Sequence, residues 1–496
     1  MLRIRVIKTA SGANAVQVVY YRNRKRVVFK HIGSANSIQE LESLKLVAQD
    51  VINNFNPEIP LFEEAKLDNL LYLDKSEFLG VYFTFLYEVI SGLLSQIGLD
   101  IIKKQLLLDL VAIRVVEPAS KLRSIELLDT YFGIKHRRQS YYHSAPQWLV
   151  LKEKIESIVV EFAKKNYAFN FDLLFYDVTT LYFETFEEDE LRKNGFSKDN
   201  KSKQPQILVA LLVTKEGFPI AYSIFSGNTF EGHTIIPVVN NFIKKYAVKD
   251  FTVVADAAMI STINTQELLK NNINYIVGAR LGNLPNELIE RIDRSITRED
   301  GRSIRIKTRN GYLVCSYSAV RYRKDKHEME KQIQRAKAII ETPSKGKKVK
   351  FIKTTGEQVV LNQALVEKSK KLLGIKGYYT NLDESTVSNQ TIIERYHELY
   401  RVEQAFRISK HDLQTRPIFH FKEEPINLHI LICFMALVVS KHIELATGDS
   451  IRKFITECKK VTDARMLNKI TNKEIRIKTK YNDKILKYLK SLNLPH

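Results

Sequence analysis

The fold is decided by residues 392–410, which read Ile392-Ile393-Glu394-Arg395-Tyr396-His397-Glu398-Leu399-Tyr400-Arg401-Val402-Glu403-Gln404-Ala405-Phe406-Arg407-Ile408-Ser409-Lys410. They contain neither Gly nor Pro and include many good helix formers, so they predict one long amphipathic helix. An apolar stripe that can pack on a sheet runs along this helix at Leu399, Val402 and Phe406.

The neighbouring side of the same helix is charged. Tyr396, Glu403 and Lys410 follow one another at intervals of seven residues, and Arg407 comes four residues after Glu403. This row of an acid, two cations and a phenol has two interpretations. It is a solvated row of surface ion pairs, or it holds a metal ion and a phosphate backbone.

The whole chain carries a large positive excess. Lys and Arg number 77 and Asp and Glu number 56, which leaves a net charge of +21 over 496 residues. The basic residues are spread along the entire length. Such an excess predicts a polyanionic partner, with nucleic acid first and an anionic membrane surface second. The length predicts several domains with cores of their own.

The cysteines and the apolar runs indicate the compartment. Cys315, Cys433 and Cys458 lie far apart and form no CxxC pair, so they fit a reducing compartment and predict neither a disulfide framework nor a zinc site. We expect no signal peptide, because the N-terminus lacks a continuous apolar run. The run Leu428–Ser440 is too short for a bilayer and predicts a buried helix, so no membrane partner is expected.

The pattern of helices, strands and turns divides the chain into six segments. They are 1–55, a small antiparallel β unit and a helix; 56–168, a helical region; 169–281, the first part of an α/β core; 282–376, an insertion; 377–445, the second part of the core; and 446–496, a basic C-terminal region. The core follows the order β-β-β-α-β-α-β, which predicts a mixed sheet covered by helices. The insertion is expected to be β-rich, since Asn310-Gly311 is a strong hairpin signal.

Two segments before the core are candidates for nucleic-acid contact. Residues 1–55 either contact DNA or only cap the next domain. In the helical region, residues 135–143 mix cations with aromatic side chains, which suits phosphate contact together with stacking on a base or sugar. Arg137 and Arg138 are the candidate DNA-binding residues there. The alternative is a solvated basic loop.

Two acids lie where apolar strands should not carry charge. Asp177 interrupts the apolar run 173–183, and Asp256 closes the run 251–255. Burying a carboxylate without a partner costs free energy. Each aspartate is therefore expected either to reach solvent at the end of its strand or to have a cation beside it. If the first and fourth strands are neighbours, Asp177 and Asp256 meet, and the long helix can add Glu403. Such oxygen ligands suit Mg²⁺ or Mn²⁺, and two ions about 4 Å apart can promote phosphoryl transfer.

Three segments together resemble the motifs of a known family, the DDE transposases of bacterial insertion sequences, which have an RNase H-like core. These segments are Tyr176–Thr180, Ala255–Met259 and the row Tyr396, Glu403 and Lys410. The row is similar to the Y-R-E-K signature of one superfamily, in which an arginine stands three residues after the tyrosine. Leu399 holds that position here, and Arg401 or Arg407 is a candidate for the arginine's role.

The resemblance implies a reaction and its partners. Metal-bound Asp177, Asp256 and Glu403 would hydrolyse a phosphodiester at each transposon end with two Mg²⁺ or Mn²⁺ ions, and the freed 3′-hydroxyl would attack target DNA. The implied DNA-binding residues are Tyr396, Arg401, Arg407 and Lys410. The expected partners are the double-stranded terminal inverted repeats and target DNA, bound by a homodimer at the nucleoid in the bacterial cytoplasm. A catalytically inactive transposon-derived DNA-binding protein and an RNase H-like nuclease or resolvase remain alternatives.

Overall fold

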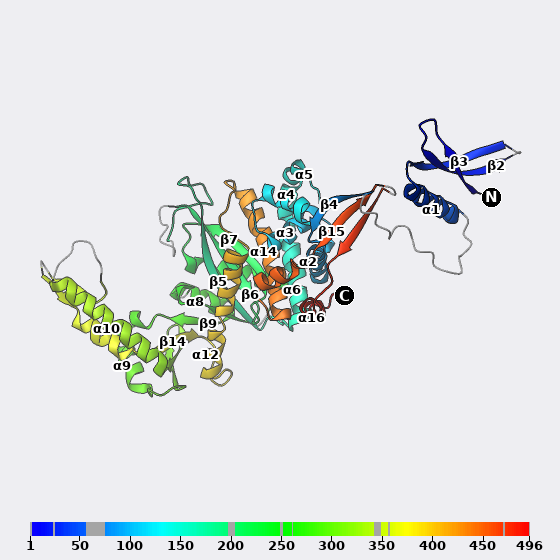
Figure 1. Ribbon diagram of the computed structural model, residues 1–496. Helices are drawn as coiled ribbons and strands as arrows, with labels where there is room; N and C mark the ends of the chain where they lie inside the picture. The colour runs from blue at the N-terminus through cyan, green and yellow to red at the C-terminus, as the bar shows by residue number, and fades with distance from the viewer. Residues whose placement is uncertain are drawn as a thin grey trace. The chain divides into compact units, whose positions relative to one another are not determined.

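The computed structural model describes residues 2–22, 25–55, 75–196, 204–248, 251–259, 261–341, 349–355, 358–469 and 472–495 (Figure 1). Residues 56–74 of the predicted helical region and 342–348 of the predicted insertion lie outside the described residues. The chain forms two compact units. The first comprises Met1–Glu88, Asp129–Ile134 and Ile455–Lys487, and the second comprises Val89–Leu128, Lys135–Phe454 and Tyr488–His496.

The second unit is built on a mixed sheet to which eight of the described strands belong, in the order β10-β11-β14-β9-β8-β5-β6-β7. They are β5 (Leu173–Tyr182), β6 (Gln206–Val213), β7 (Pro219–Ser226), β8 (Thr252–Ala255), β9 (Asn274–Ala279), β10 (Ser303–Thr308), β11 (Gly311–Tyr317) and β14 (Ile375–Thr380). β5 pairs antiparallel with β6 and parallel with β8, and β8 pairs parallel with β9. The predicted RNase H-like mixed sheet is thereby confirmed, and its first and fourth strands are neighbours.

Helices cover this sheet, so that every residue of β6, which lies beside the edge strand β7, is buried. The helices whose residues all belong to the second unit are α3 (Gln105–Val116), α5 (Arg138–Ser144), α6 (Lys152–Tyr167), α7 (Ile235–Tyr246), α8 (Thr262–Lys270), α9 (Asn286–Ser295), α10 (Ala319–Glu341), α11 (Gln363–Lys371), α12 (Asn389–His397), α13 (Tyr400–Arg407) and α14 (Glu423–Thr447). Shorter helical turns are η3 (Leu99–Ile102), η4 (Ala145–Leu151), η5 (Glu231–His233), η6 (Ala257–Met259), η7 (Leu281–Asn283) and η8 (Ile408–Asp412). Residues of α2 (Thr84–Ile97), α4 (Lys121–Phe132), α15 (Ile451–Cys458) and α16 (Asp483–Ser491) are divided between the two units.

The central helix α14 contains the apolar run that the sequence analysis expected to be buried. It is longer than that run, and by length and composition it could cross a membrane. However, 94% of its most apolar 18-residue window is buried inside the protein. It packs against α3 and β7, so α14 serves as a core helix of the second unit.

The strands expected in a separate β-rich insertion extend the main sheet instead, because β11 pairs with β14. The Asn310-Gly311 turn joins β10 to β11 as predicted. The rest of segment 282–376 is mostly helical, with one small hairpin of β12 (Ile352–Thr355) and β13 (Gln358–Leu361). Its own apolar cluster is formed by Met329, Ala336, Phe351, Val366 and Leu373.

The first unit contains two small antiparallel sheets. One consists of β1 (Arg3–Lys8), β2 (Asn14–Arg22) and β3 (Lys25–Ala35), and α1 (Ile38–Phe55) packs on it. In the other, β15 (Asp463–Asn468) lies between β16 (Lys473–Lys478) and β4 (Ser76–Tyr82). The basic C-terminal segment therefore pairs with a strand from the segment that we expected to be helical, and this pairing joins residues far apart in the sequence.

The single helix predicted over 392–410 is corrected to three consecutive pieces, α12, α13 and the π-helical turn η8. At the first break the amide of Leu399 donates to the carbonyl of Tyr396, only three residues back, at 3.1 Å, and the amide of Val402 does the same to Leu399. Such a 3₁₀ turn changes the helix direction without Gly or Pro. As a result α12 packs on β9 and β14, whereas α13 packs on β5 and β6.

Candidate active site

The two aspartates that interrupt apolar strands lie next to each other. The parallel pairing of β5 with β8 matches Tyr176 with Ala255, and Asp177 and Asp256 are the following residues. Neighbouring strands are about 5 Å apart, and matched positions point to the same face of a sheet. Asp177 is half-buried and Asp256, at the end of β8, is exposed. The register therefore brings these two acids together, as the sequence analysis expected.

Asp256 is held by two hydrogen bonds. Its Oδ1 accepts one from the backbone amide of Ala257 at 2.7 Å and one from the phenolic oxygen of Tyr396 at 3.3 Å. Burial, followed by the charge of Asp256, raises the pKa of Tyr396, so its hydroxyl keeps its proton and remains a donor. A Cβ at Gly278 would collide with the Tyr396 oxygen. The ring thus reaches Asp256 across a glycine on β9.

Glu403 is presented by the amphipathic helix α13. Val402, Ala405 and Phe406 are buried against the sheet, which leaves Glu403 exposed. Glu403 and Asp256 both interact electrostatically with Lys376 on β14. Burial and Arg321 lower the pKa of Lys376, while the charges of Asp256 and Glu403 act in the opposite direction. Both acids therefore lie within electrostatic range of the same ammonium group.

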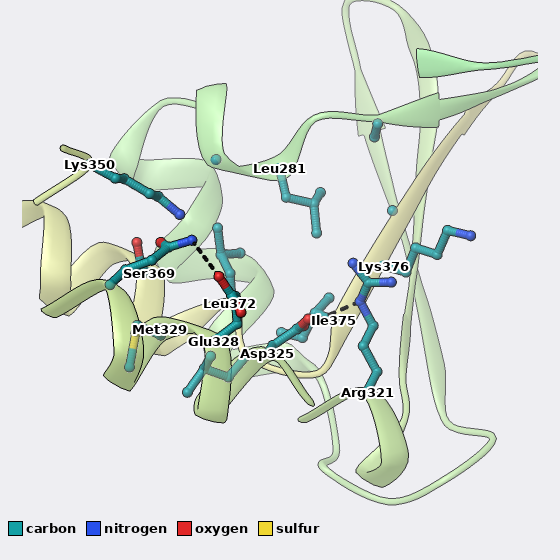
Figure 2. Close-up of a pocket in the computed structure, with 15 residues that line it drawn as sticks. Leu281, Arg321, Asp325, Glu328, Met329, Lys350, Ser369, Leu372, Ile375 and Lys376 are labelled. Atoms are coloured by element: carbon teal, nitrogen blue, oxygen red, sulfur yellow. Dashed lines mark hydrogen bonds and ion pairs between the residues drawn. The ribbon is translucent and has the colours of Figure 1, made fainter. Parts of the chain in front are cut away.

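Lys376 is a site residue that the sequence analysis missed. Its Nζ lies over the ring of Tyr396, 4.8 Å from the centroid. It also lines a cavity of about 330 Å³ together with Arg321 and Asp325, which form an ion pair at 3.3 Å. Figure 2 shows Lys376 and Arg321 on the same side of this cavity. A lysine inside the otherwise apolar and aromatic strand 375–380 was the signal that could have revealed it.

The sequence of the region that contains this site matches a known family. Residues 170–439, more than half of the chain, match the family model described as "Transposase DDE domain". The chain belongs to the DDE transposase family. The matched transposase segment includes Asp177, Asp256, Lys376 and Glu403.

Comparisons with individual proteins add little to the family match. No curated protein matches this transposase by sequence. A cryo-EM structure of the piggyBac transposase synaptic complex with hairpin DNA is similar in fold, with a TM-score of 0.37 and 13% sequence identity. The similar region covers 69% of this chain and 62% of that chain. This transposase therefore spans less than two thirds of the piggyBac chain.

The basic residues predicted to contact DNA on the transposase helix have different surroundings. Lys410 lies in η8 and lines a small cavity with Thr179 of β5, two residues after Asp177. Arg407 is exposed on α13. Arg401 is half-buried, with its Nη2 3.3 Å from Glu398 and its Cβ close to Gly217 in the β6–β7 turn. Leu399, at the arginine position of the signature, is buried at the break between α12 and α13.

The other two predicted DNA contacts of the transposase lie at α5. Arg137 is exposed immediately before this helix. Arg138, its first residue, forms an exposed ion pair with Glu126 at 2.7 Å. Such an exposed pair contributes little to stability. Both arginines are therefore accessible at the surface of the second unit.

The donor atoms of the transposase site suit a hard divalent cation, because carboxylate oxygens are the ligands that Mg²⁺ and Mn²⁺ prefer. Within the described ranges, however, no three His, Cys, Asp or Glu side chains are grouped closely enough to hold a metal ion. Asp177, Asp256 and Glu403 all belong to those ranges. Since Glu403 is exposed, its carboxylate has room to turn toward the two aspartates. The site therefore offers the oxygen ligands that Mg²⁺ and Mn²⁺ prefer, but its three carboxylates are farther apart than a bound ion requires.

Proposed function

We propose that this chain is the transposase of an insertion sequence, which cuts the ends of its element and joins them to target DNA. The proposal rests on the parallel register of β5 and β8, in which Asp177 and Asp256 directly follow the matched pair Tyr176 and Ala255. Glu403 lies on α13, which packs on β5. Membership of the DDE family supports an enzyme of this general class. The presence of all three acids favours an active enzyme over an inactive DNA-binding relative.

We further propose that Asp177, Asp256 and Glu403 hold two Mg²⁺ or Mn²⁺ ions. When bound, such ions activate a water or 3′-hydroxyl and stabilise the leaving oxygen of a phosphodiester. The surrounding residues position the acids for this task. Tyr396 and the amide of Ala257 fix the carboxylate of Asp256. Lys376 offsets the repulsion between Asp256 and Glu403 before the ions bind.

Double-stranded DNA is the proposed partner, and the net charge of +21 supplies a strong, salt-dependent attraction to it. The exposed Arg407 and the surface arginines Arg137 and Arg138 are suited to phosphate contacts. Tyr396 and Lys410 would position the strand nearer to the carboxylates. Arg401 is the weakest of these candidates, because it is half-buried against the β6–β7 turn. The joining of two ends favours a homodimer on DNA, in the bacterial cytoplasm and without a membrane partner.

The sheet of the first unit favours DNA contact over a capping role. Val16 and Val18 point toward α1 and belong to its core cluster. On the opposite face, the strand register places Arg5, Gln17 and His31 in one row across the three strands. Arginine side chains such as that of Arg5 read the edges of bases in the major groove, which is wide enough to admit strands. We propose that this row, the "β-sheet row", contacts the transposon ends.

The decisive test is a cleavage assay with the DNA that borders the coding sequence and carries its inverted repeats. With Mg²⁺ or Mn²⁺ the protein should nick the repeat ends and transfer the 3′-ends to a target plasmid. Asp256→Asn should abolish both steps while leaving repeat binding intact. Tight binding without cleavage would support the inactive relative. Cleavage of branched substrates without strand transfer would support a resolvase.

A further inference from the structure

A second cluster of charged groups lies in the second unit and shares no residue with the candidate active site. Arg114 of α3 and Lys121, the first residue of α4, are 3% and 4% exposed. The Nη2 of Arg114 donates to the carbonyl of Ala119 at 2.6 Å, and its Nε has no hydrogen-bond partner among the described residues. The Nζ of Lys121 lies 3.0 Å from Nδ1 of His429.

No acid balances these buried cations. In the described part of the chain, neither Arg114 nor Lys121 forms an ion pair with a carboxylate. Burial and the charge of Arg114 hold the pKa of Lys121 well below its usual range. Burial followed by the charges of Lys121 and Arg114 lowers the pKa of His420 to about 4, and the same causes hold the pKa of His429 well below its usual range. Because buried charge without a counter-charge is costly, an anion beside Arg114 and Lys121 would stabilise their charged forms.

Two cavities meet at Lys121. The first has a volume of about 280 Å³ and is lined by the polar side chains of Arg114, Lys121, Arg123 and His429. The second has a volume of about 340 Å³ and is lined by Tyr141, Tyr142, Pro146 and Leu428. Ser120, Lys121, Phe419 and His420 belong to the walls of both. A basic cavity and an aromatic cavity therefore share one wall.

The chemistry of the two cavities fits the two halves of a nucleotide. The first cavity offers buried cations beside the N-terminus of α4, where helix amides attract a phosphate. The second offers the rings of Tyr142 and Phe419, which are 63% and 62% exposed and can stack on a base. The aromatic and basic stretch 135–143 supplies part of this wall, which gives a physical basis for its composition.

We propose that the paired cavities bind a nucleoside monophosphate, with the phosphate beside Lys121 and Arg114 and the base against Tyr142 and Phe419. The ligand is a free nucleotide or one unpaired nucleotide of a DNA strand, since both present the same phosphate and base. This binding is separate from the cleavage chemistry at Asp177 and Asp256. It therefore holds or fails independently of the proposed transposase activity.

The chain contains its own reporter for this site. Trp148 is the sole tryptophan of the sequence, and its buried ring lies 6.0 Å from that of Tyr141, between ring centroids. We would titrate the metal-free full-length protein with dAMP, deoxyadenosine and inorganic phosphate while recording Trp148 fluorescence, and would repeat the titrations by calorimetry. We expect saturable binding of dAMP. Deoxyadenosine and phosphate should each bind at least about tenfold more weakly, because each fills only one cavity.

Three variants locate the binding. Tyr142→Ala removes an exposed ring without disturbing the core, and it should weaken dAMP binding about tenfold. Lys121→Met should weaken it by about tenfold or more, through loss of the charged partner of the phosphate. Lys244→Met is the matched control, because this exposed lysine of α7 lines neither cavity. It changes the net charge equally and should bind dAMP as the parent does.

Further titrations distinguish the two sources of the ligand. Binding of a single-stranded oligonucleotide that depends on Lys121 and Tyr142 assigns the site to a DNA strand, whereas binding of dAMP alone assigns it to a free nucleotide. The proposal is overturned if no probe binds, if phosphate binds as tightly as dAMP, or if Tyr142→Ala and Lys121→Met both leave the affinity unchanged. Asp177→Asn should retain dAMP binding, which separates this result from any failure of DNA cleavage.

Discussion

The phenolic oxygen of Tyr396 lies 3.3 Å from Oδ1 of Asp256 and donates a hydrogen bond to it. Tyr396→Phe removes this bond and keeps the ring. Since a hydrogen bond to a charged group contributes about 1.5–3 kcal/mol, we expect single-turnover cleavage to slow about tenfold or more. Tyr378→Phe is the matched control, because its hydroxyl lies 3.1 Å from His397 instead. Equal rates in both variants would contradict a positioning role for Tyr396.

The close approach of Tyr396 to β9 depends on Gly278. In Gly278→Ala the new Cβ would meet the Tyr396 oxygen and would lie 3.1 Å from the Cβ of Ala257. We expect a loss of about 1–3 kcal/mol in the free energy of unfolding, measured in urea, because the neighbours must move. Cleavage should fall as well. Gly282→Ala tests the same change where no atom lies within 4 Å of the new Cβ. A similar loss in both variants would remove the steric explanation.

Lys376 interacts with both Asp256 and Glu403. Lys376→Met leaves these acids with less positive charge nearby, so a divalent cation should bind more tightly by about tenfold. The measurement is a Mn²⁺ titration of the protein, together with the Mg²⁺ concentration that gives half-maximal cleavage. Lys376→Arg retains the charge and should behave like the parent. A higher Mg²⁺ requirement in Lys376→Met would show that Lys376 does not oppose the ions.

The buried His442 gives the protein an acid-sensitive stability. Burial lowers its pKa to about 4, whereas an unfolded histidine takes up its proton near pH 6.5. Between these values the unfolded chain binds more protons, so the free energy of unfolding falls as the pH falls from 6.5 toward 4. Urea unfolding between pH 7 and pH 5 measures this slope while most carboxylates remain ionised. His442→Gln should have a shallower slope than the parent. A slope that His442→Gln does not alter would exclude this origin.

The β-sheet row predicts a DNA-binding phenotype in the first unit. Arg5→Ala should weaken binding to the inverted repeats by about tenfold, since one arginine contact to a base contributes about 1–3 kcal/mol. Binding to unrelated duplex DNA should change less. Lys45→Ala provides the control, because Lys45 lies on α1 and pairs with Glu42 at 2.8 Å. Gel-shift titrations at one fixed salt concentration compare them. Equal losses on both DNAs would mean that Arg5 contacts only phosphate.

The sequence predicted the strands β5 and β8 and the proximity of Asp177 and Asp256, because the apolar runs that indicate them are local features of the sequence. Asp177 stands out inside an apolar run, and the order of strands and helices allows β5 and β8 to be neighbours. The relation of Lys376 to Asp256 was beyond such reasoning, since it depends on β14 joining β9 after a long intervening segment. The same holds for the hairpin 303–317, whose strands were predicted but whose partner strand was not.

The break between α12 and α13 was missed for a different reason. Residues 392–410 have uniform helix propensity, and Glu398 and Leu399 carry no breaker signal. Packing decides this break, because α12 and α13 rest on different strands of the sheet. Tertiary contacts thus override a local preference, as they commonly do. The spacing of Tyr396 and Glu403 was therefore informative about the site, although the two residues do not share one continuous helix.

The pairing of β4 with β15 sets the order in which the protein can mature. Tyr82 of β4 is matched with Asp463 of β15, so the ribosome must synthesise β15 before this sheet can form. Until β15 is synthesised, β4 has an unpaired edge, and unpaired strand edges can pair with other chains and aggregate. A nascent chain can therefore form the main sheet of its second unit, whose described strands end at Thr380, before β4 meets β15. The candidate aspartates Asp177 and Asp256 can thus take their places on the main sheet while the first unit still lacks β15.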